Sequence, residues 1–418
     1  MRDHELNAFA AELDARLSGA DSALARRYPG DRDVRQPVHT VYVPGDRYTA
    51  GTVRDWGEQA LAALDRHAPT AEEFAGITGV AADAVSEVYP WVREKLSREP
   101  VEDLRIDFED GFTAGEDAED AAVVAAAQVL AESVRAGTAP PFHGIRFKSF
   151  EAPTRRRGLR TLVRFVEALH EAGGLGEGFV VTLPKVTSAE QVEAMVLVCE
   201  RLEAALGLAA RSLRFEIQVE TPQCIVGADG SVPIARMLHA ADGRCTGLHY
   251  GTYDYSASCG IAAAYQSMEH PAADHAKAVM QVAAAGTGVH LSDGSTNVLP
   301  AGGPSQVQAA WRLHTRLVRR SLERGFYQGW DLHPAQLPTR YLATYAFYRQ
   351  GLPDALTRLH AYTGGGDSAY LDEPATAAAL ARFVLRGVDC GGVSAAEVTE
   401  RTGLDLDRLT VLAHPRPR

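Results

Sequence analysis

Acidic residues gather at the end of one apolar stretch, in the segment DLRIDFEDGF. Apolar and polar residues alternate along it, which indicates a β-strand with one apolar face. Asp107, Glu109 and Asp110 follow one another where this strand should end. Because like charges this close repel one another, we expect a cation or a cationic side chain among them.

Polar side chains also stand at the ends of the later apolar stretches. In chain order they are Arg146, Lys148, Lys185, Glu220, His249, Asp254, Ser292, Asp293, Asp331 and His333. Carboxylates that share one site need a positive charge, and oxygen donors select Mg²⁺ or Mn²⁺ over zinc. Glu220 and Asp254 are the best candidate ligands, because each follows an apolar stretch and precedes turn-forming residues. A solvated loop carboxylate is the alternative for each.

Arg146 lies in the otherwise apolar stretch GIRFKSF and therefore needs an anionic partner. A substrate carboxylate would supply one through two parallel hydrogen bonds, and an ion pair with Asp107 or Glu109 is the alternative. Lys185 could form a Schiff base, but neighbouring acids would keep its ammonium charged. His249 could bind substrate or act as a base, or it could be a structural histidine.

The elements that carry these residues alternate along the chain. Apolar stretches begin near positions 39, 103, 143, 178, 214, 246, 288 and 326, and helical patterns separate nearly all of them. This order predicts an α/β fold, a (β/α)8 TIM barrel whose active site lies at the carboxyl ends of its strands. A doubly wound open sheet is disfavoured, since no glycine-rich dinucleotide or phosphate loop follows any stretch.

Three regions are predicted from these patterns. Residues 1–38 form an N-terminal helical extension, and residues 39–337 form the barrel, with a helical insertion at 52–98. Residues 338–418 form a C-terminal helical segment that contributes to the active site.

The composition excludes several classes of protein. The 418 residues carry a net charge of −12, which argues against binding to nucleic acids or anionic membranes. No stretch is long and apolar enough to span a bilayer, and no signal peptide is evident. The five cysteines are scattered without a CxxC pair, as in a cytoplasmic protein with reduced thiols.

The order of the motifs resembles the citrate lyase β-subunit-like group of the HpcH/HpaI aldolase superfamily, which are TIM barrels related to malate synthase. The resemblance runs from about 39 to 387. The segments that carry it are VYVPGDR, IDFEDGF, GIRF, LPKV, EIQVETP, YGTYDYSASCG, GWDLHPAQL and LDEPATAAALARFVL.

The resemblance implies a role for each candidate residue. Glu220 and Asp254 would bind Mg²⁺ (or Mn²⁺), while Asp107 and Glu109 would order the waters around it. Asp372 would be a mobile acid or base supplied by the C-terminal segment. In such families that segment can cover the active-site mouth of a neighbouring subunit, so a homo-oligomer, a trimer or hexamer, is expected. The candidate site residues are thus Arg146, Glu109 and Asp372 for catalysis; Arg146, Lys148, Asp107 and His249 for substrate; and Glu220 and Asp254 for the metal.

These residues predict a Mg²⁺-dependent carbon–carbon lyase or aldolase. Its substrate would be an oxo acid or hydroxy acid, with or without an acyl-CoA partner, in an aldol or Claisen-type cleavage or condensation. The alternatives are a non-catalytic barrel that binds an oxo acid as a sensor or regulatory subunit, and an imine-forming aldolase.

Overall fold

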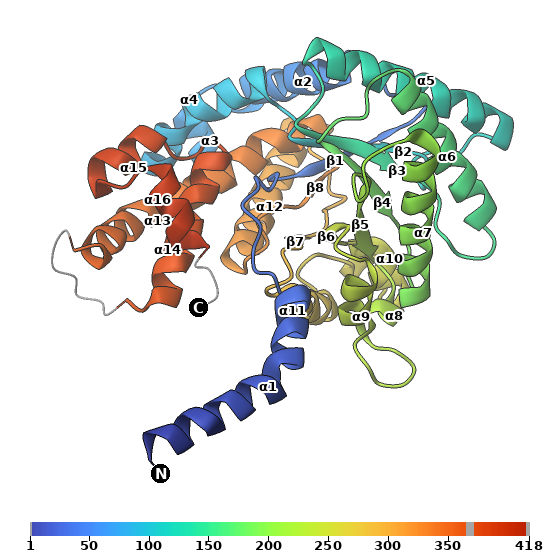
Figure 1. Cartoon of the computed structure of the whole chain (residues 1–418). Coiled ribbons are helices and arrows are strands. Elements are labelled where there is room, and N and C mark those ends of the chain that lie inside the picture. The colour runs from blue at the N-terminus through green and yellow to red at the C-terminus, as the bar shows by residue number, and fades with distance from the viewer. Residues whose placement is uncertain (1, 365–371, 415–418) are drawn as a thin grey trace.

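The computed structural model describes residues 2–364 and 372–414. Its centre is an eight-stranded sheet in which every neighbouring pair is parallel, in the order β7-β6-β5-β4-β3-β2-β1-β8 (Figure 1). The strands are β1 (Thr40–Pro44), β2 (Asp103–Asp107), β3 (Phe142–Arg146), β4 (Phe179–Leu183), β5 (Arg214–Val219), β6 (Cys245–Tyr250), β7 (His290–Ser292) and β8 (Trp330–Asp331).

Backbone contacts between β7 and β8 close this sheet into a ring. Ser292 forms a parallel bridge with Gln328, and the Asp293 N–H donates to the Gln328 carbonyl at 2.9 Å. The Trp330 N–H donates to the Gly294 carbonyl at 3.2 Å. The predicted TIM barrel is confirmed, and the carboxyl ends of all its strands face one side.

Helices cover the outside of the barrel and connect successive strands. They are α5 (Glu116–Ala136), α6 (Arg155–Glu171), α7 (Ala189–Leu206), α8 (Pro222–Ile225), α9 (Pro233–Ala240), α10 (Thr252–Ser258), α11 (Pro271–Ala284) and α12 (Pro304–Glu323). The predicted insertion between β1 and β2 is helical, with α2 (Thr52–His67), α3 (Ala71–Thr78) and α4 (Ala82–Arg98).

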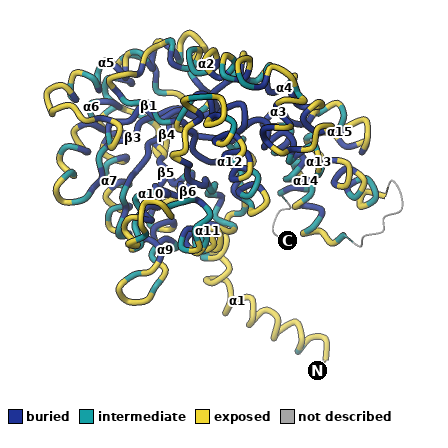
Figure 2. The backbone as a smooth tube through the Cα atoms, turned by 180° about the vertical axis from the view of Figure 1, so that it is seen from behind, coloured by how far each residue is buried: buried dark blue, intermediate teal, exposed yellow. Residues whose placement is uncertain are grey.

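Two helical regions flank the barrel. At the carboxyl end of the chain lie α13 (Leu337–Tyr362), α14 (Pro374–Asp389), α15 (Ala395–Thr402) and α16 (Leu406–Ala413). At the other end, α1 (Asp3–Arg27) extends away from the body and is exposed along its length (Figure 2). Among the described residues, no helix has the length and apolar character needed to cross a membrane.

The apolar and polar residues that alternate along β2 are all buried, so the alternation does not mark a half-exposed strand. Leu104 and Ile106 are fully buried, but Arg105 and Asp107 are buried as well. The Arg105 guanidinium donates to Glu216 on β5 at 2.8 and 3.0 Å, across the barrel interior. The polar face of β2 therefore lines the inside of the barrel instead of facing water.

One predicted strand is shorter than expected. The apolar stretch that begins near 246 was expected to reach 256, but the strand ends at Tyr250. Helix α10 begins at Thr252, directly after Gly251. Asp254 therefore lies in the first turn of a short helix above the barrel, rather than on a strand. The reason is local: the Tyr255 N–H donates to the Gly251 carbonyl at 3.2 Å, which starts the helix.

Candidate active site

The Arg146 guanidinium at the end of β3 is paired with the Asp107 carboxylate at the end of β2. Nε and Nη2 donate to the two carboxylate oxygens at 2.7 and 2.6 Å, and both side chains are buried. The backbone N–H groups of Glu109 and Gly111 donate to the same oxygens at 3.0 and 2.9 Å. Of the two partners left open by the sequence, the structure shows this ion pair. Nη1 has only long contacts, 3.4 Å to Glu109 Oε2 and 3.4 Å to Gln218 Oε1.

Lys185, which follows β4, brings an ammonium group into the carboxylate cluster. Its Nζ binds Glu109 and lies 3.0 Å from Asp110 Oδ2 and 3.3 Å from Asp254 Oδ2. Burial alone would lower the pKa of Lys185, but the hydrogen bond with Glu109 and the charges of Glu109 and Glu220 raise it. A permanently charged ammonium is a poor nucleophile, so this environment weighs against a Schiff base at Lys185.

Glu220, directly after β5, is a buried carboxylate without an ion-pair partner in the described part of the chain. Gln218 Nε2 donates to Oε2 at 2.6 Å, and the backbone N–H of Lys185 donates to Oε1 at 2.8 Å. Burial raises the pKa of Glu220 well above its usual value. The negative charge of Asp254 raises it further, whereas the positive charge of Arg146 lowers it. A positive charge beside Glu220 would therefore favour its ionised form.

Two glycines leave the space that these carboxylates occupy. A Cβ on Gly251 would lie 2.5 Å from Glu220 Cβ and 2.7 Å from Oε2. A Cβ on Gly111 would lie 2.5 Å from Asp107 Oδ2. No side chain fits at either position without displacing the acid, so both glycines are part of the site.

The oxygen donors at the carboxyl ends of the strands, called the mouth of the barrel from here on, fit Mg²⁺ or Mn²⁺. Glu220 and Asp254 supply hard oxygen donors, and a dication beside Glu220 would offset the cost of burying its charge. Over residues 2–364 and 372–414, no three histidine, cysteine, aspartate or glutamate side chains converge as a complete ligand set. Mg²⁺ commonly uses one or two protein carboxylates and completes its shell with water and substrate.

Two predicted substrate contacts have partners within the protein. His249 is buried deeper in the barrel, where Nε2 lies 3.0 Å from Glu216 Oε2 and Nδ1 lies 3.4 Å from Trp330 Nε1. Lys148 follows β3, and its Nζ donates to the Phe108 carbonyl at 2.9 Å. The structure therefore does not bring His249 to the mouth, and it holds Lys148 against the backbone after β2.

Asp372 lies in the C-terminal segment and binds Arg358 of α13. The Arg358 guanidinium donates to its two oxygens at 2.5 and 3.1 Å. This hydrogen bond lowers the pKa of Asp372. No described contact joins Asp372 to the carboxyl ends of the strands in its own chain. The preceding segment, 365–371, lies outside the described residues.

The polar residues expected from β7 and β8 have structural partners instead. Asp293 accepts from Lys277 Nζ at 2.9 Å, and Asp331 accepts from Arg340 at 2.9 Å and from His39 at 2.9 Å. These partners lie on the surrounding helices or at the start of β1, so both acids face away from the mouth. Their place at strand ends predicted the opposite, because the inward or outward direction of a strand residue depends on register.

Sequence reasoning assigned no site role to two residues that the structure places there. Acids were expected around Lys185, and its Nζ contacts three carboxylates, but Lys185 was not among the candidate site residues. The Tyr42 ring lies 4.7 Å from the Arg146 guanidinium and 4.6 Å from the Trp330 ring. The alternation in HTVYVPGD could have identified Tyr42, because it follows the same inward face as the polar residues of β2.

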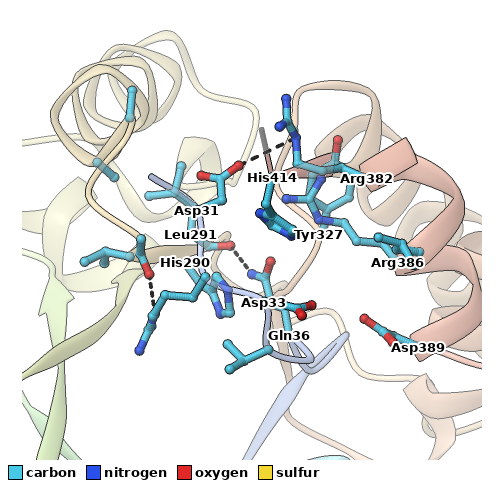
Figure 3. Close-up of a pocket in the computed structure, with 18 of the residues that line it drawn as sticks. Asp31, Asp33, Gln36, His290, Leu291, Tyr327, Arg382, Arg386, Asp389 and His414 are labelled. Atoms are coloured by element: carbon cyan, nitrogen blue, oxygen red, sulfur yellow. Dashed lines mark hydrogen bonds and ion pairs between the residues drawn. The ribbon is translucent and has the colours of Figure 1, made fainter. Parts of the chain in front are cut away.

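A separate cavity of about 230 Å³ lies at the opposite end of the barrel (Figure 3). His290 at the start of β7, Gln36 before β1 and Tyr327 before β8 line it, together with Arg386 of α14. Burial and the charge of Arg32 lower the pKa of His290 to about 3. This cavity contains none of the candidate carboxylates, so it is distinct from the mouth.

Comparison with solved structures supports the shared fold. Native Haloferax volcanii malate synthase at 3 mM glyoxylate superposes with a TM-score of 0.50 at 14% identity, covering 93% of this chain and 99% of that one. The magnesium/glyoxylate complex of that enzyme gives 0.50 at 13% identity, with 91% and 89% covered. A citrate lyase beta subunit complexed with oxaloacetate and magnesium, from M. tuberculosis, gives 0.42 at 17% identity, with 73% and 96% covered.

The superposition on malate synthase shows a common barrel fold, and at this level the resemblance inferred from the sequence motifs is confirmed. A search of curated proteins found no match. A family described as a domain of unknown function, DUF6986, matches residues 17–417, which include the entire barrel and the C-terminal helices. The chain therefore belongs to the DUF6986 family.

Proposed function

We propose that this protein is a Mg²⁺-dependent lyase or condensing enzyme that makes or breaks a carbon–carbon bond in an oxo acid or hydroxy acid. The observation that carries the proposal is the link through Gln218. Its amide oxygen lies 3.4 Å from Arg146 Nη1, and its amide nitrogen donates to Glu220 at 2.6 Å. One side chain thus couples a guanidinium to a candidate metal ligand inside the mouth.

This arrangement suits a small chelating anion. The carboxylate of an oxo acid would accept from Arg146 Nη1, the nitrogen without a close partner, while Asp107 holds the other two nitrogens in place. A divalent ion held by Glu220 and Asp254 would polarise the neighbouring oxygen of the substrate. The shared fold with a malate synthase that was solved with magnesium and glyoxylate supports this substrate class.

The chain offers two groups for proton transfer. Burial raises the pKa of Glu109, and the charge of Asp110 adds to this effect, although Arg146 and Lys185 oppose it. A carboxyl group with a raised pKa at the mouth holds its proton more readily, which suits a general acid or base. Asp372 is the second candidate, and it would have to reach the mouth of a neighbouring subunit.

A substrate screen tests the proposal directly. Oxo acids and hydroxy acids would be supplied with and without acyl-CoA partners, and turnover would be followed over a Mg²⁺ titration. Wild-type protein should show Mg²⁺-dependent turnover, and Glu220→Gln should abolish it. Asp242→Asn, on the surface away from the mouth, is the matched control and should retain full activity.

The alternatives give different results in the same experiment. A sensor or regulatory barrel would bind an oxo acid, seen as a rise in thermal stability, without any turnover. An imine-forming aldolase would yield a borohydride-trapped adduct with pyruvate and would ignore chelators. Full activity of wild-type protein in excess chelator would refute the metal-dependent mechanism.

A further inference from the structure

Helix α1 is long and apolar on one side, and none of its side chains is buried against the described part of the chain. It nevertheless carries five large apolar side chains. Leu6, Phe9, Leu13, Leu17 and Leu24 are between 42% and 61% exposed. Large apolar side chains that recur at helical spacing and stay in water indicate a surface that another molecule covers.

The body of the chain anchors only the root of this helix. The Tyr28 ring packs edge-on against His239 at 5.5 Å, and the Gly30 N–H donates to the Gly286 carbonyl at 2.9 Å. From this root the helix projects outward (Figures 1 and 2). A helix held at one end keeps its apolar side open to a second molecule.

The leucines of α1 are arranged symmetrically about Ala15, although Phe9 is not, since the position equidistant from Ala15 is Asp21. Leu13 and Leu17 are equidistant from Ala15, as are Ala10 and Ala20, and Leu6 and Leu24. Suppose that two such helices run antiparallel and that their two-fold axis passes at the level of Ala15. Each leucine of one copy then lies opposite a leucine of the other copy. Successive positions are spaced by three or four residues, which keeps them on one side of the helix.

The two halves of α1 also differ in charge. The first half carries four acids, Asp3, Glu5, Glu12 and Asp14, whereas the second half carries three arginines, Arg16, Arg26 and Arg27, and one acid, Asp21. At 100° per residue, Glu5, Glu12, Arg16 and Arg27 lie along one edge of the apolar stripe. In an antiparallel pair this edge faces its own copy, so Glu12 lies within two positions of Arg16 and Glu5 within two positions of Arg27, each twice, while Arg16 also approaches Arg16 of the other copy.

We propose that α1 is a self-association device: two copies of this chain pair through α1, antiparallel, about a two-fold axis at Ala15. A self-complementary surface of this kind generates a closed two-fold contact. Antiparallel packing also aligns the helix dipoles favourably and sets the acidic half of each helix against the basic half of the other. The contact is independent of the candidate active site and of any contact between barrels.

Mass measurement tests the contact first. Sedimentation velocity on full-length protein should give the wild type twice the mass of the double variant Leu13→Asp/Leu17→Asp. Because α1 contributes nothing to the buried core, both proteins should have the same far-ultraviolet signature for the barrel and the same melting temperature. Equal masses for the two proteins would refute the proposal.

Charge reversal tests the antiparallel direction. Glu12→Arg places arginine near Arg16, and Arg16→Glu places glutamate near Glu12, so each variant alone should dissociate at least tenfold more readily than the wild type. Mixed together, the two variants restore every opposite-charge contact along this edge. The mixture should therefore form a heterodimer with an affinity within a few fold of the wild type.

Two results would overturn the assignment. Failure of the mixed variants to associate would exclude the antiparallel register, because a parallel pair gains no such contact between positions 12 and 16. Binding of wild-type protein to anionic lipid vesicles, lost in Leu13→Asp/Leu17→Asp and accompanied by a single-chain mass in solution, would assign the stripe to a membrane surface instead.

Discussion

Asp107→Asn tests whether the mouth is held by a buried ion pair. The change keeps the size of the side chain but replaces one acceptor oxygen with an NH₂ donor. That donor would face either the Arg146 guanidinium or the backbone N–H groups after β2, which now donate to the carboxylate at 2.9 and 3.0 Å. The guanidinium would keep its charge, with Glu109 Oε2 at 3.4 Å as the nearest anion.

The expected cost follows from the burial of the pair. The Arg146 and Asp107 side chains are 8% and 3% exposed, and removing one partner of a buried pair costs about 3–5 kcal/mol. Glu109 partly compensates, so we expect about 3 kcal/mol. Unfolding entropy of about 2.1 cal/mol/K per residue gives about 0.9 kcal/mol/K for 418 residues, so Tm should fall by about 3 °C.

Scanning calorimetry with a matched variant makes this measurable. Asp242→Asn removes an ion pair with Arg211 whose side chains are 49% and 63% exposed, and such pairs contribute about 1 kcal/mol or less. Asp242 has a φ of 49°, which asparagine adopts readily, so the control adds no backbone strain. Its Tm should fall by about 1 °C at most.

The double variant Asp107→Asn/Arg146→Met separates the causes. If the stranded guanidinium dominates, removing it should recover part of the lost Tm. A Tm for Asp107→Asn no lower than that of Asp242→Asn would refute the reasoning, because it would mean that water already screens the pair.

The remaining predictions concern Glu220 and its surroundings. Without Mg²⁺, Glu220→Gln should raise Tm, because it removes a buried charge. The same variant should abolish the rise in Tm that Mg²⁺ induces. A magnesium response equal to that of the wild type would contradict the role of Glu220 as a ligand. The pKa of Glu220 is raised on folding, so its contribution to metal-free stability should fall as pH rises from about 4.5 through the higher folded pKa, measured as the Tm difference from Glu220→Gln. Gly251→Ala should cost about 1–3 kcal/mol by overpacking against Glu220 and weaken Mg²⁺ binding, whereas Gly76→Ala, where a Cβ meets nothing within 4 Å, should cost nothing by calorimetry.

Periodicity in the sequence was sufficient to predict the barrel. Runs such as Phe179–Leu183 are apolar apart from Thr182, because both faces of a strand in a parallel barrel are covered. Helical spacing between them predicted the crossovers, and strand ends predicted the side on which Asp107, Arg146 and Glu220 would lie. These features are local, so they can be read from neighbouring residues.

Partners across the barrel depend on register and could not be read in this way. Arg146 binds Asp107, 39 positions earlier, and Lys185 reaches Glu109, 76 positions earlier. His249 turned into the interior toward Glu216, and Asp293 and Asp331 turned outward toward helices. A shift of one residue reverses the direction of a strand side chain, and no local pattern fixes that choice for polar residues.

The sequence by itself therefore determined the alternating strands and helices, and the kinds of residue at the mouth. Tertiary structure decided which of them meet, because ion pairing at Arg146 and Lys185 depends on distances between separate strands. It also left the apolar stripe of α1 uncovered, although the same leucine spacing would fit a helix packed on the barrel. Burial of that stripe depends on whether a second surface lies within reach, which only the folded chain determines.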